Sequence, residues 1–98
     1  MNLFKLIRKR ILDQTYSEVE RWQRHFYNLA VQNRKHEVSK HYYGSAASGL
    51  GIALQCIDEA RYARTAADVW REYIANDTAA ELEDLAKRVG AELNSSVH

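Results

Sequence analysis

The sequence predicts an all-α protein, a long antiparallel helical hairpin plus a shorter C-terminal helix, assembled as a dimer or higher oligomer. Apolar residues recur every three or four positions along nearly the whole chain, which is the spacing of one helix face. No stretch alternates with period two for long enough to make a strand, and the 98 residues include no proline. A chain of this length forms one domain, residues 1–98, whose core is marginal in a monomer, so we expect self-association.

The first element is a basic amphipathic segment over residues 1–14, which begins MNLFKLIRKRIL. Its apolar side chains can form one side of a helix: Leu3, Phe4, Ile7 and Ile11. Its cations surround that side, and we expect them to contact a partner: Lys5, Arg8, Lys9 and Arg10. The apolar side could pack on the hairpin or on a dimer mate, fit a groove of another protein, or meet an anionic membrane or nucleic acid.

Two long helices are predicted next, over residues 15–33 and 37–76, with a turn in the polar stretch QNRKHEVSK between them. An apolar series in steps of three and four begins just before the first helix, at Leu12, and continues along it: Tyr16, Val19, Trp22, Phe26 and Leu29. The second has the same spacing: Ala53, Ile57, Ala60, Ala63, Ala67, Trp70 and Ile74. Folding the chain at the turn places these two faces against each other.

A third helix is predicted over residues 78–93. Thr78 precedes an apolar-periodic run, and Glu81 follows three residues later, which is the spacing of a capping box at a helix start. We expect the buried stripe of this helix to be Leu82, Leu85, Ala86, Val89 and Leu93.

The stretch HYYGSAASGLGIAL, His41 to Leu54, holds three of the four glycines. It lacks the lysine of a phosphate-binding P-loop and the preceding strand of a dinucleotide fold, so we interpret it as a seam for helix packing. Bulky residues of the first helix would nest against small residues of the second, and the proposed seam is Trp22, Phe26, Leu29, Gly44, Ala47, Ser48 and Gly51. The pattern does not separate an intrachain seam from one between subunits.

Composition and spacing argue against chemistry in this chain. Residues 1–40 hold nine basic and four acidic side chains, and residues 41–98 hold five basic and nine acidic ones, so the halves are expected to neutralise each other or the basic half to meet an anion. His36 and His41 are five residues apart and diverge by about 140° on a helix, which does not suit a shared metal ion. We expect no catalytic residue, no metal site and no cofactor, and we expect Cys56 to be a buried small residue.

Aromatic and basic residues gather in the sequence near the turn. They form a candidate partner-binding patch: Arg24, Tyr27, Arg34, Tyr42 and Tyr43. Such patches are common at protein interfaces and can also stack nucleotides or bases, while tyrosines of this kind also occur simply as amphipathic helix residues.

The stretch RWQRHFYNLA resembles part of the phage lambda-type host-nuclease inhibitor Gam, over about a tenth of the chain. The matching positions are Trp22, Arg24, His25, Phe26, Leu29 and Ala30. The resemblance implies an all-helical, dimeric inhibitor of the host RecBCD helicase–nuclease that acts by occupying its DNA-binding region. That family relies on an acidic surface, whereas the matching half of this chain is basic.

We therefore expect a small non-enzymatic, phage-encoded protein that binds and modulates a host protein or nucleoprotein machine in the host cytoplasm, with a DNA-repair nuclease as one candidate. A helical protein that binds nucleic acid or a nucleotide through its basic N-terminal half is the alternative. A peripheral membrane protein, attached through the amphipathic N-terminal segment, is a further alternative.

Overall fold

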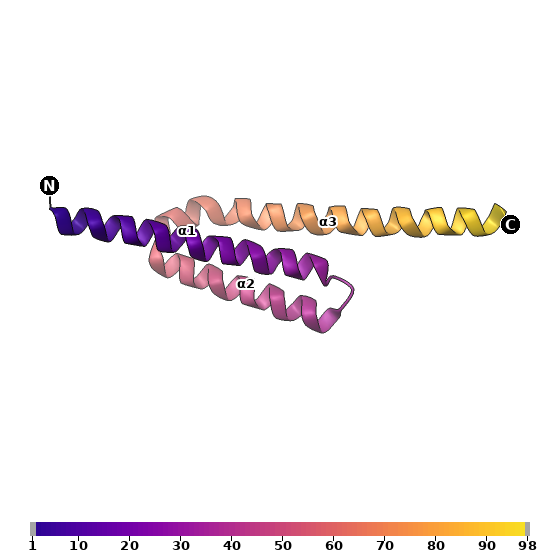
Figure 1. Cartoon of the computed structure of the whole chain (residues 1–98), viewed down its shortest axis with the longest axis horizontal. Coiled ribbons are helices and arrows are strands. Elements are labelled where there is room, and N and C mark those ends of the chain that lie inside the picture. The colour runs from indigo at the N-terminus through magenta and orange to yellow at the C-terminus, as the bar shows by residue number, and fades with distance from the viewer. Residues whose placement is uncertain (1, 98) are drawn as a thin grey trace.

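A computed structural model describes residues 2–97, which form three helices and no strand: α1 (Leu3–Gln32), α2 (Glu37–Ile57) and α3 (Glu59–Val97). The all-α prediction is confirmed. The chain runs along α1, back along α2 and out again along α3 (Figure 1). The molecule measures 76 × 24 × 17 Å, and its radius of gyration of 19.2 Å exceeds the roughly 13 Å of a compact chain of this length.

α1 is one continuous helix, so the predicted segment 1–14 and helix 15–33 are parts of a single element; Met1 lies outside the described residues. Neither glycine nor proline interrupts residues 3–32. Asn2 caps the start, where its Oδ1 accepts a 3.0 Å hydrogen bond from the backbone N–H of Phe4. At the other end, the backbone N–H and the Nδ2 of Asn33 both donate to the carbonyl of Leu29, at 3.0 and 2.8 Å.

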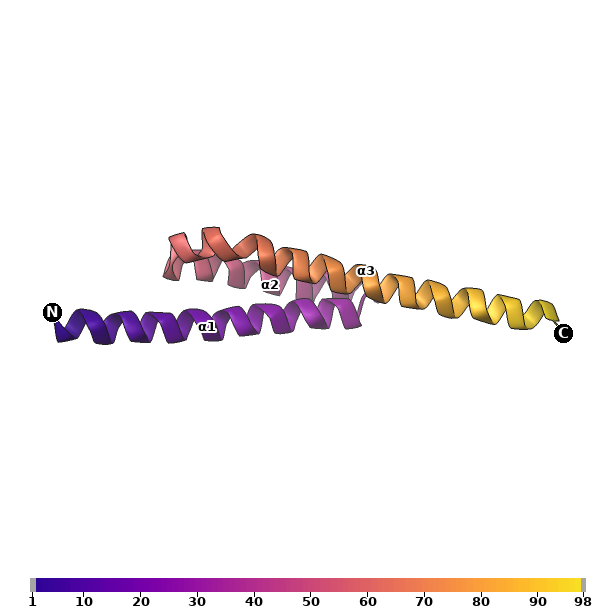
Figure 2. The ribbon, with the colours of Figure 1, turned by 90° about the horizontal axis from the view of Figure 1, so that it is seen from above.

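The predicted helix 37–76 is wrong, because the chain breaks at Asp58. This residue is extended, with φ −154° and ψ 92°, and its backbone N–H donates to the Leu54 carbonyl to close α2. Its carboxylate accepts a 3.0 Å hydrogen bond from the backbone N–H of Arg61, which caps the start of α3. Because one residue ends α2 and begins α3, the chain reverses direction within a sharp elbow (Figure 2).

The predicted break before Thr78 is also wrong, because α3 continues through it as the longest helix, with 39 residues. The acids that suit a helix start have a different role here. Asp77 and Glu81 each lie 3.6 Å from the guanidinium of Arg34 on α1. A tertiary ion pair therefore uses Glu81, the acidic side chain that the capping box would need.

The core is a narrow line of residues at the meeting of the three helices. Its buried hydrophobic members are Tyr16, Tyr27, Ala30, Ala47, Leu54 and Val69. Gln23 is only 5% exposed, and its Nε2 donates a 3.2 Å hydrogen bond to the carbonyl of Ala47. The Tyr16 hydroxyl lies 3.2 Å from Thr65 Oγ1, so polar groups join α1 to both other helices.

The seam between α1 and α2 differs from the predicted one in several members. Ala47 and Gly51 are buried against α1, whereas Ser48 is exposed and a Cβ at Gly44 would meet open space. Trp22 is 52% exposed and lies outside the seam. One residue along a helix turns the side chain by about 100°, and Gln23 takes the buried position that the apolar pattern assigned to Trp22.

Phe26 and Leu29, the other predicted members on α1, are half-buried, and Phe26 packs against the cluster of Tyr27, Ala47 and Val69. Cys56, expected inside, is exposed.

Acidic side chains of α3 form ion pairs with the basic residues around the α1–α2 turn. Arg34 lies 3.0 Å from Asp84, which Lys35 also approaches at 3.5 Å, and Lys40 lies 3.9 Å from Asp77. The basic first half of the chain is therefore neutralised in part by the acidic second half, which is one of the two arrangements that the charge distribution predicted.

Candidate protein-binding surfaces

A line of aromatic rings crosses from α1 to α2 on the outside of the molecule. It consists of Trp22, His25 and Phe26 on α1 and of Tyr43 and Tyr42 on α2, and we call it the aromatic strip. Consecutive ring centroids are 5.5 Å apart for Trp22 and His25, 5.8 Å for His25 and Phe26, 6.3 Å for Phe26 and Tyr43, and 5.5 Å for Tyr43 and Tyr42. These separations are those of stacked and edge-to-face ring pairs.

The aromatic strip is accessible at both ends. Trp22 is 52% and Tyr42 is 66% exposed, while Phe26 and Tyr43 between them are half-buried. A shallow hollow of about 330 Å³ lies beside Trp22 and is lined by Glu18, Arg21, Trp22 and His25. Large rings that remain in water and adjoin a hollow are typical of the residues that dominate protein interfaces.

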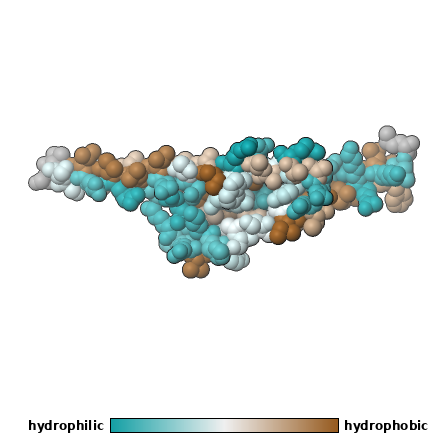
Figure 3. Space-filling view, turned by 180° about the vertical axis from the view of Figure 1, so that it is seen from behind, coloured by the Kyte–Doolittle hydropathy of each residue, from teal (hydrophilic) through white to brown (hydrophobic). Residues whose placement is uncertain are grey.

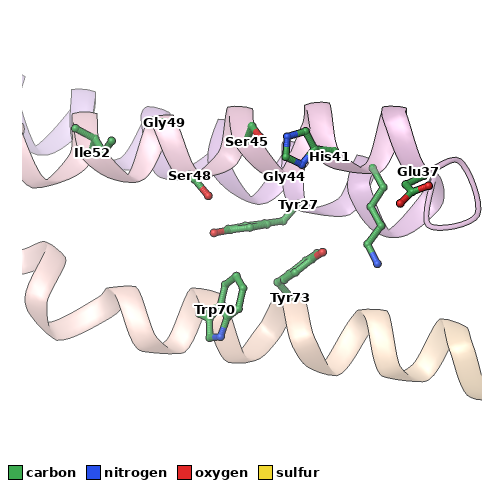
Figure 4. A pocket seen from close by; sticks show the side chains of 11 residues that line it. Tyr27, Glu37, His41, Gly44, Ser45, Ser48, Gly49, Ile52, Trp70 and Tyr73 are labelled. Atoms are coloured by element: carbon green, nitrogen blue, oxygen red, sulfur yellow. The ribbon is translucent and has the colours of Figure 1, made fainter.

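A second group of rings lies in an open groove of about 630 Å³ between α2 and α3. The rings of Tyr27 and Tyr73 stack with centroids 4.6 Å apart, and Trp70 meets Tyr73 at 5.5 Å. Small residues of α2 line the facing wall, with Gly44 and Ser48 above Tyr27 (Figure 4). Burial raises the pKa of Tyr27, although Ser48 acts in the opposite direction, and burial together with Asp77 raises the pKa of Tyr73.

The predicted aromatic–basic patch does not form one surface. Tyr27 is buried and faces α3, and the side chain of Arg34 is only 17% exposed because it is enclosed by acids of α3. Arg24 is paired with Glu20 at 2.7 Å and with Glu72 at 3.1 Å. The exposed remainder, Tyr42 and Tyr43, belongs to the aromatic strip.

The cations around Asp84 stabilise the charged form of its carboxyl group. Partial burial alone would raise the pKa of Asp84, but Lys35 and Arg34 hold that pKa below its usual value near 3.8. Arg34 Nε and Asp77 Oδ1 are buried, 3.6 Å apart, and have no hydrogen-bond partner among the described residues. This pair therefore interacts through charge, whereas Arg34 Nη1 donates a 3.0 Å hydrogen bond to Asp84 Oδ2 in the same group of ion pairs.

The N-terminal segment, residues 3–14 of α1, projects beyond the elbow and is exposed throughout. Its apolar side chains lie in water rather than on the protein's own hairpin, and Phe4 is 84% exposed. Within residues 2–97, its four cations form no ion pair: Lys5, Arg8, Lys9 and Arg10.

The C-terminal segment, residues 81–93 of α3, begins beside the α1–α2 turn, where Glu81 and Asp84 meet Arg34, and then projects beyond the turn. The stripe that was expected to be buried is exposed, with exposed fractions between 46% and 61%: Leu82, Leu85, Val89 and Leu93. Figure 3 shows apolar side chains along one edge of this end of the molecule. Helical periodicity identified this stripe but could not show that no part of the same chain covers it.

The part of the chain that the structure describes contains no group of three or more His, Cys, Asp or Glu placed to hold a metal ion. None of its helices is long and apolar enough to cross a membrane.

The fold and the exposed surfaces define an elongated three-helix protein that carries apolar and aromatic side chains on its surface. Comparison with protein-family models, with curated proteins and with solved structures finds no match for the chain.

Proposed function

We propose that this chain is a non-enzymatic binding protein that captures a protein partner on the aromatic strip and modulates that partner by covering part of its surface. The exposure of Trp22 at one end of the strip carries the proposal. A tryptophan ring that is half in water, backed by His25 and Phe26, can gain a large apolar contact on binding while losing little conformational freedom.

The first partner to test is a host DNA-repair nuclease of the RecBCD type. Three residues of the stretch that resembles Gam belong to the aromatic strip: Trp22, His25 and Phe26. In this proposal the chain is a phage-encoded inhibitor that acts in the host cytoplasm. It contacts the nuclease through aromatic side chains, since the half of the chain that resembles Gam is basic and does not offer the acidic surface on which DNA mimicry depends.

The experiment compares Trp22→Ala with Trp70→Ala, because both rings are 52% exposed but lie on different surfaces. Calorimetric titration into the purified nuclease, together with its exonuclease rate, should show binding roughly thirtyfold weaker for Trp22→Ala and unchanged for Trp70→Ala. Circular dichroism should show both variants folded. Equal affinities of the wild type and Trp22→Ala would refute the role of the strip.

If the wild-type chain does not bind this nuclease, the choice of partner is wrong while the strip can still be tested. In that case, capture from a bacterial lysate should be lost with Trp22→Ala and retained with Trp70→Ala.

The unpaired cations of the N-terminal segment favour nucleic acid or a nucleotide as a second candidate ligand. Binding should then weaken steeply as salt rises, because each phosphate contact releases counterions. Arg8→Gln with Arg10→Gln should reduce the slope of log affinity against log salt by about two. Fluorescence anisotropy with labelled DNA and RNA at low salt tests this candidate, and an absence of binding removes it.

A further inference from the structure

The apolar stripes at both ends of the molecule face away from its core. At about 100° per residue, Phe4, Ile7 and Ile11 lie roughly 150° around α1 from the buried face that carries Tyr16 and Tyr27. On α3, the stripe of the C-terminal segment lies on the side opposite Val69. Neither stripe can therefore be covered by a small adjustment of the protein's own hairpin.

The two segments match in length and lie at opposite ends of the long axis (Figures 1 and 2). At 1.5 Å per residue, the N-terminal segment is about 18 Å long and the C-terminal segment is about 20 Å long. One segment can therefore cover the other along its full length.

Their charges are opposite in sign. The N-terminal segment carries four basic side chains and one acidic one, and the C-terminal segment carries four acidic and two basic ones. Arg8 and Arg10 flank the first stripe on its two sides, and Glu83 and Glu92 flank the second. Glu83 has an exposed partner, Lys87 at 3.2 Å, which an incoming arginine could replace or join.

Small residues border the second stripe and permit a close approach: Ala79, Ala86 and Gly90. A Cβ at Gly90 would have no neighbour within 4 Å, so this border is open. A helix laid on the stripe would reach the backbone of α3 there.

The accessible surface area of the chain is larger than that of a typical folded monomer of the same mass. Its accessible surface is 7649 Å², whereas a folded monomer of 11.3 kDa exposes roughly 5,700 Å². The excess is roughly twice the 800 Å² or so that one partner loses in a standard interface, which corresponds to two contacts per copy.

We infer that a second copy of this chain is the occupant, and that the N-terminal segment of one copy packs along the C-terminal segment of the next. Pairing two N-terminal segments would bring two positively charged helices together, and pairing two C-terminal segments would bring two negatively charged ones together. The head-to-tail contact joins opposite charges and covers both stripes. It is heterologous, so each copy offers one donor and one acceptor end, and it is independent of the aromatic strip.

The test uses two double variants of exposed residues, and each variant disrupts the apolar stripe at one end of the chain. One variant carries Phe4→Asp and Ile7→Asp, and the other carries Leu85→Asp and Val89→Asp. Analytical ultracentrifugation over the micromolar range should show association of the wild type, monomers of each variant alone, and a one-to-one pair when the two variants are mixed. Val38→Asp is the matched control: Val38 is an 85% exposed apolar residue at the start of α2, outside both stripes, so this variant should associate like the wild type.

Charge exchange gives an independent readout. Arg8→Glu with Arg10→Glu should weaken association roughly tenfold, and adding Glu83→Arg with Glu92→Arg to the same chain should restore it. Added salt should weaken the wild-type assembly and leave the fold intact, as circular dichroism would show.

Several results would overturn the inference. A wild-type chain that stays monomeric across the range would do so, and so would either aspartate variant that still self-associates, since like segments would then be pairing. A monomeric wild type that sediments with phosphatidylserine-containing vesicles, through a contact that Phe4→Asp with Ile7→Asp abolishes, would assign the segment to a lipid surface instead.

Discussion

The substitution Gly51→Ala tests how closely α2 approaches α1. A Cβ added at Gly51 would lie 3.0 Å from Gln23 Nε2 and 3.2 Å from the Tyr62 hydroxyl, both closer than an ordinary contact. A Cβ added at Gly49, two residues earlier on the same helix, would have no neighbour within 4 Å. The two sites share helical backbone and differ in the space around them.

The expected effects have opposite directions. Gly49→Ala should raise the free energy of unfolding by about 0.8–1 kcal/mol, the difference in helix propensity between the two residues. Gly51→Ala gains the same propensity but displaces Gln23, whose buried hydrogen bond to Ala47 contributes about 1 kcal/mol, and it also crowds Tyr62. Its net effect should lie between zero and a loss of about 1 kcal/mol, so the two variants should differ by about 1–2 kcal/mol.

Thermal and urea unfolding followed by circular dichroism measures this difference. At about 4–8 °C per kcal/mol for a domain of this size, the variants should differ by at least about 4 °C in Tm. Low protein concentration keeps self-association out of the comparison. If Gly51→Ala stabilises as much as Gly49→Ala, the close approach is wrong. Adding Gln23→Ala to Gly51→Ala should recover part of the loss, because the crowded side chain is then removed.

Three further predictions concern the attachment of α3. Arg34→Met should lower the free energy of unfolding by about 1–2 kcal/mol and accelerate amide exchange in residues 77–84, because the partly buried Asp77 and Asp84 then keep only their longer contacts to Lys40 and Lys35. The pKa of Asp84 is lower in the folded chain than in the unfolded one, so the ionised carboxylate stabilises the fold above pH 3.8 and this stabilisation is lost as the pH falls below that value. In acid unfolding curves, the free energy of unfolding of Asp84→Asn should therefore fall less steeply than that of the wild type. Burial raises the pKa of Tyr27 and of Tyr73, so as the pH rises these two side chains lose their protons more readily in the unfolded chain than in the folded one. The free energy of unfolding should therefore fall above pH 10. In the folded protein, part of the tyrosinate absorbance should appear at a higher pH than in the variants Tyr27→Phe and Tyr73→Phe.

Helix type was predictable from the sequence because periodicity is a local property, but two boundaries were not. The apolar series ran through Asp58 without a gap, although Asp58 followed by Glu59 is itself a local signal for a helix start. Thr78 and Glu81 gave a stronger local signal, but Arg34, more than forty residues earlier, pairs with Glu81 and keeps α3 continuous. A contact so distant in sequence leaves no trace in the local pattern.

The candidate surfaces were predicted in part for a related reason. Tyr42 and Tyr43 on α2 were predicted to bind a partner, whereas Trp22 on α1 was predicted to lie in the packing seam. Whether Trp22 stays in water depends on the rotation of α1. That rotation is set by Gln23, a polar residue that the hydrophobic pattern counts as surface and that finds its acceptor on Ala47, 24 residues away. Periodicity likewise identified the stripes of residues 3–11 and 82–93 without showing that they lack an internal partner.

The elbow at Asp58 has a consequence for the shapes available to the chain. Straightening this one residue would fuse α2 and α3 into a continuous rod from Glu37 to Val97, about 90 Å long. The carboxylate of Asp58 opposes such fusion, because it accepts a hydrogen bond from the backbone N–H of Arg61. That N–H is available to a side chain in the first turn of a helix, whereas in a helix interior it would donate to a backbone carbonyl. The carboxylate of Asp58, together with the ion pairs and stacked rings that hold α3 on α1 and on the α1–α2 turn, thus opposes an extended form in which two chains could exchange their last helices.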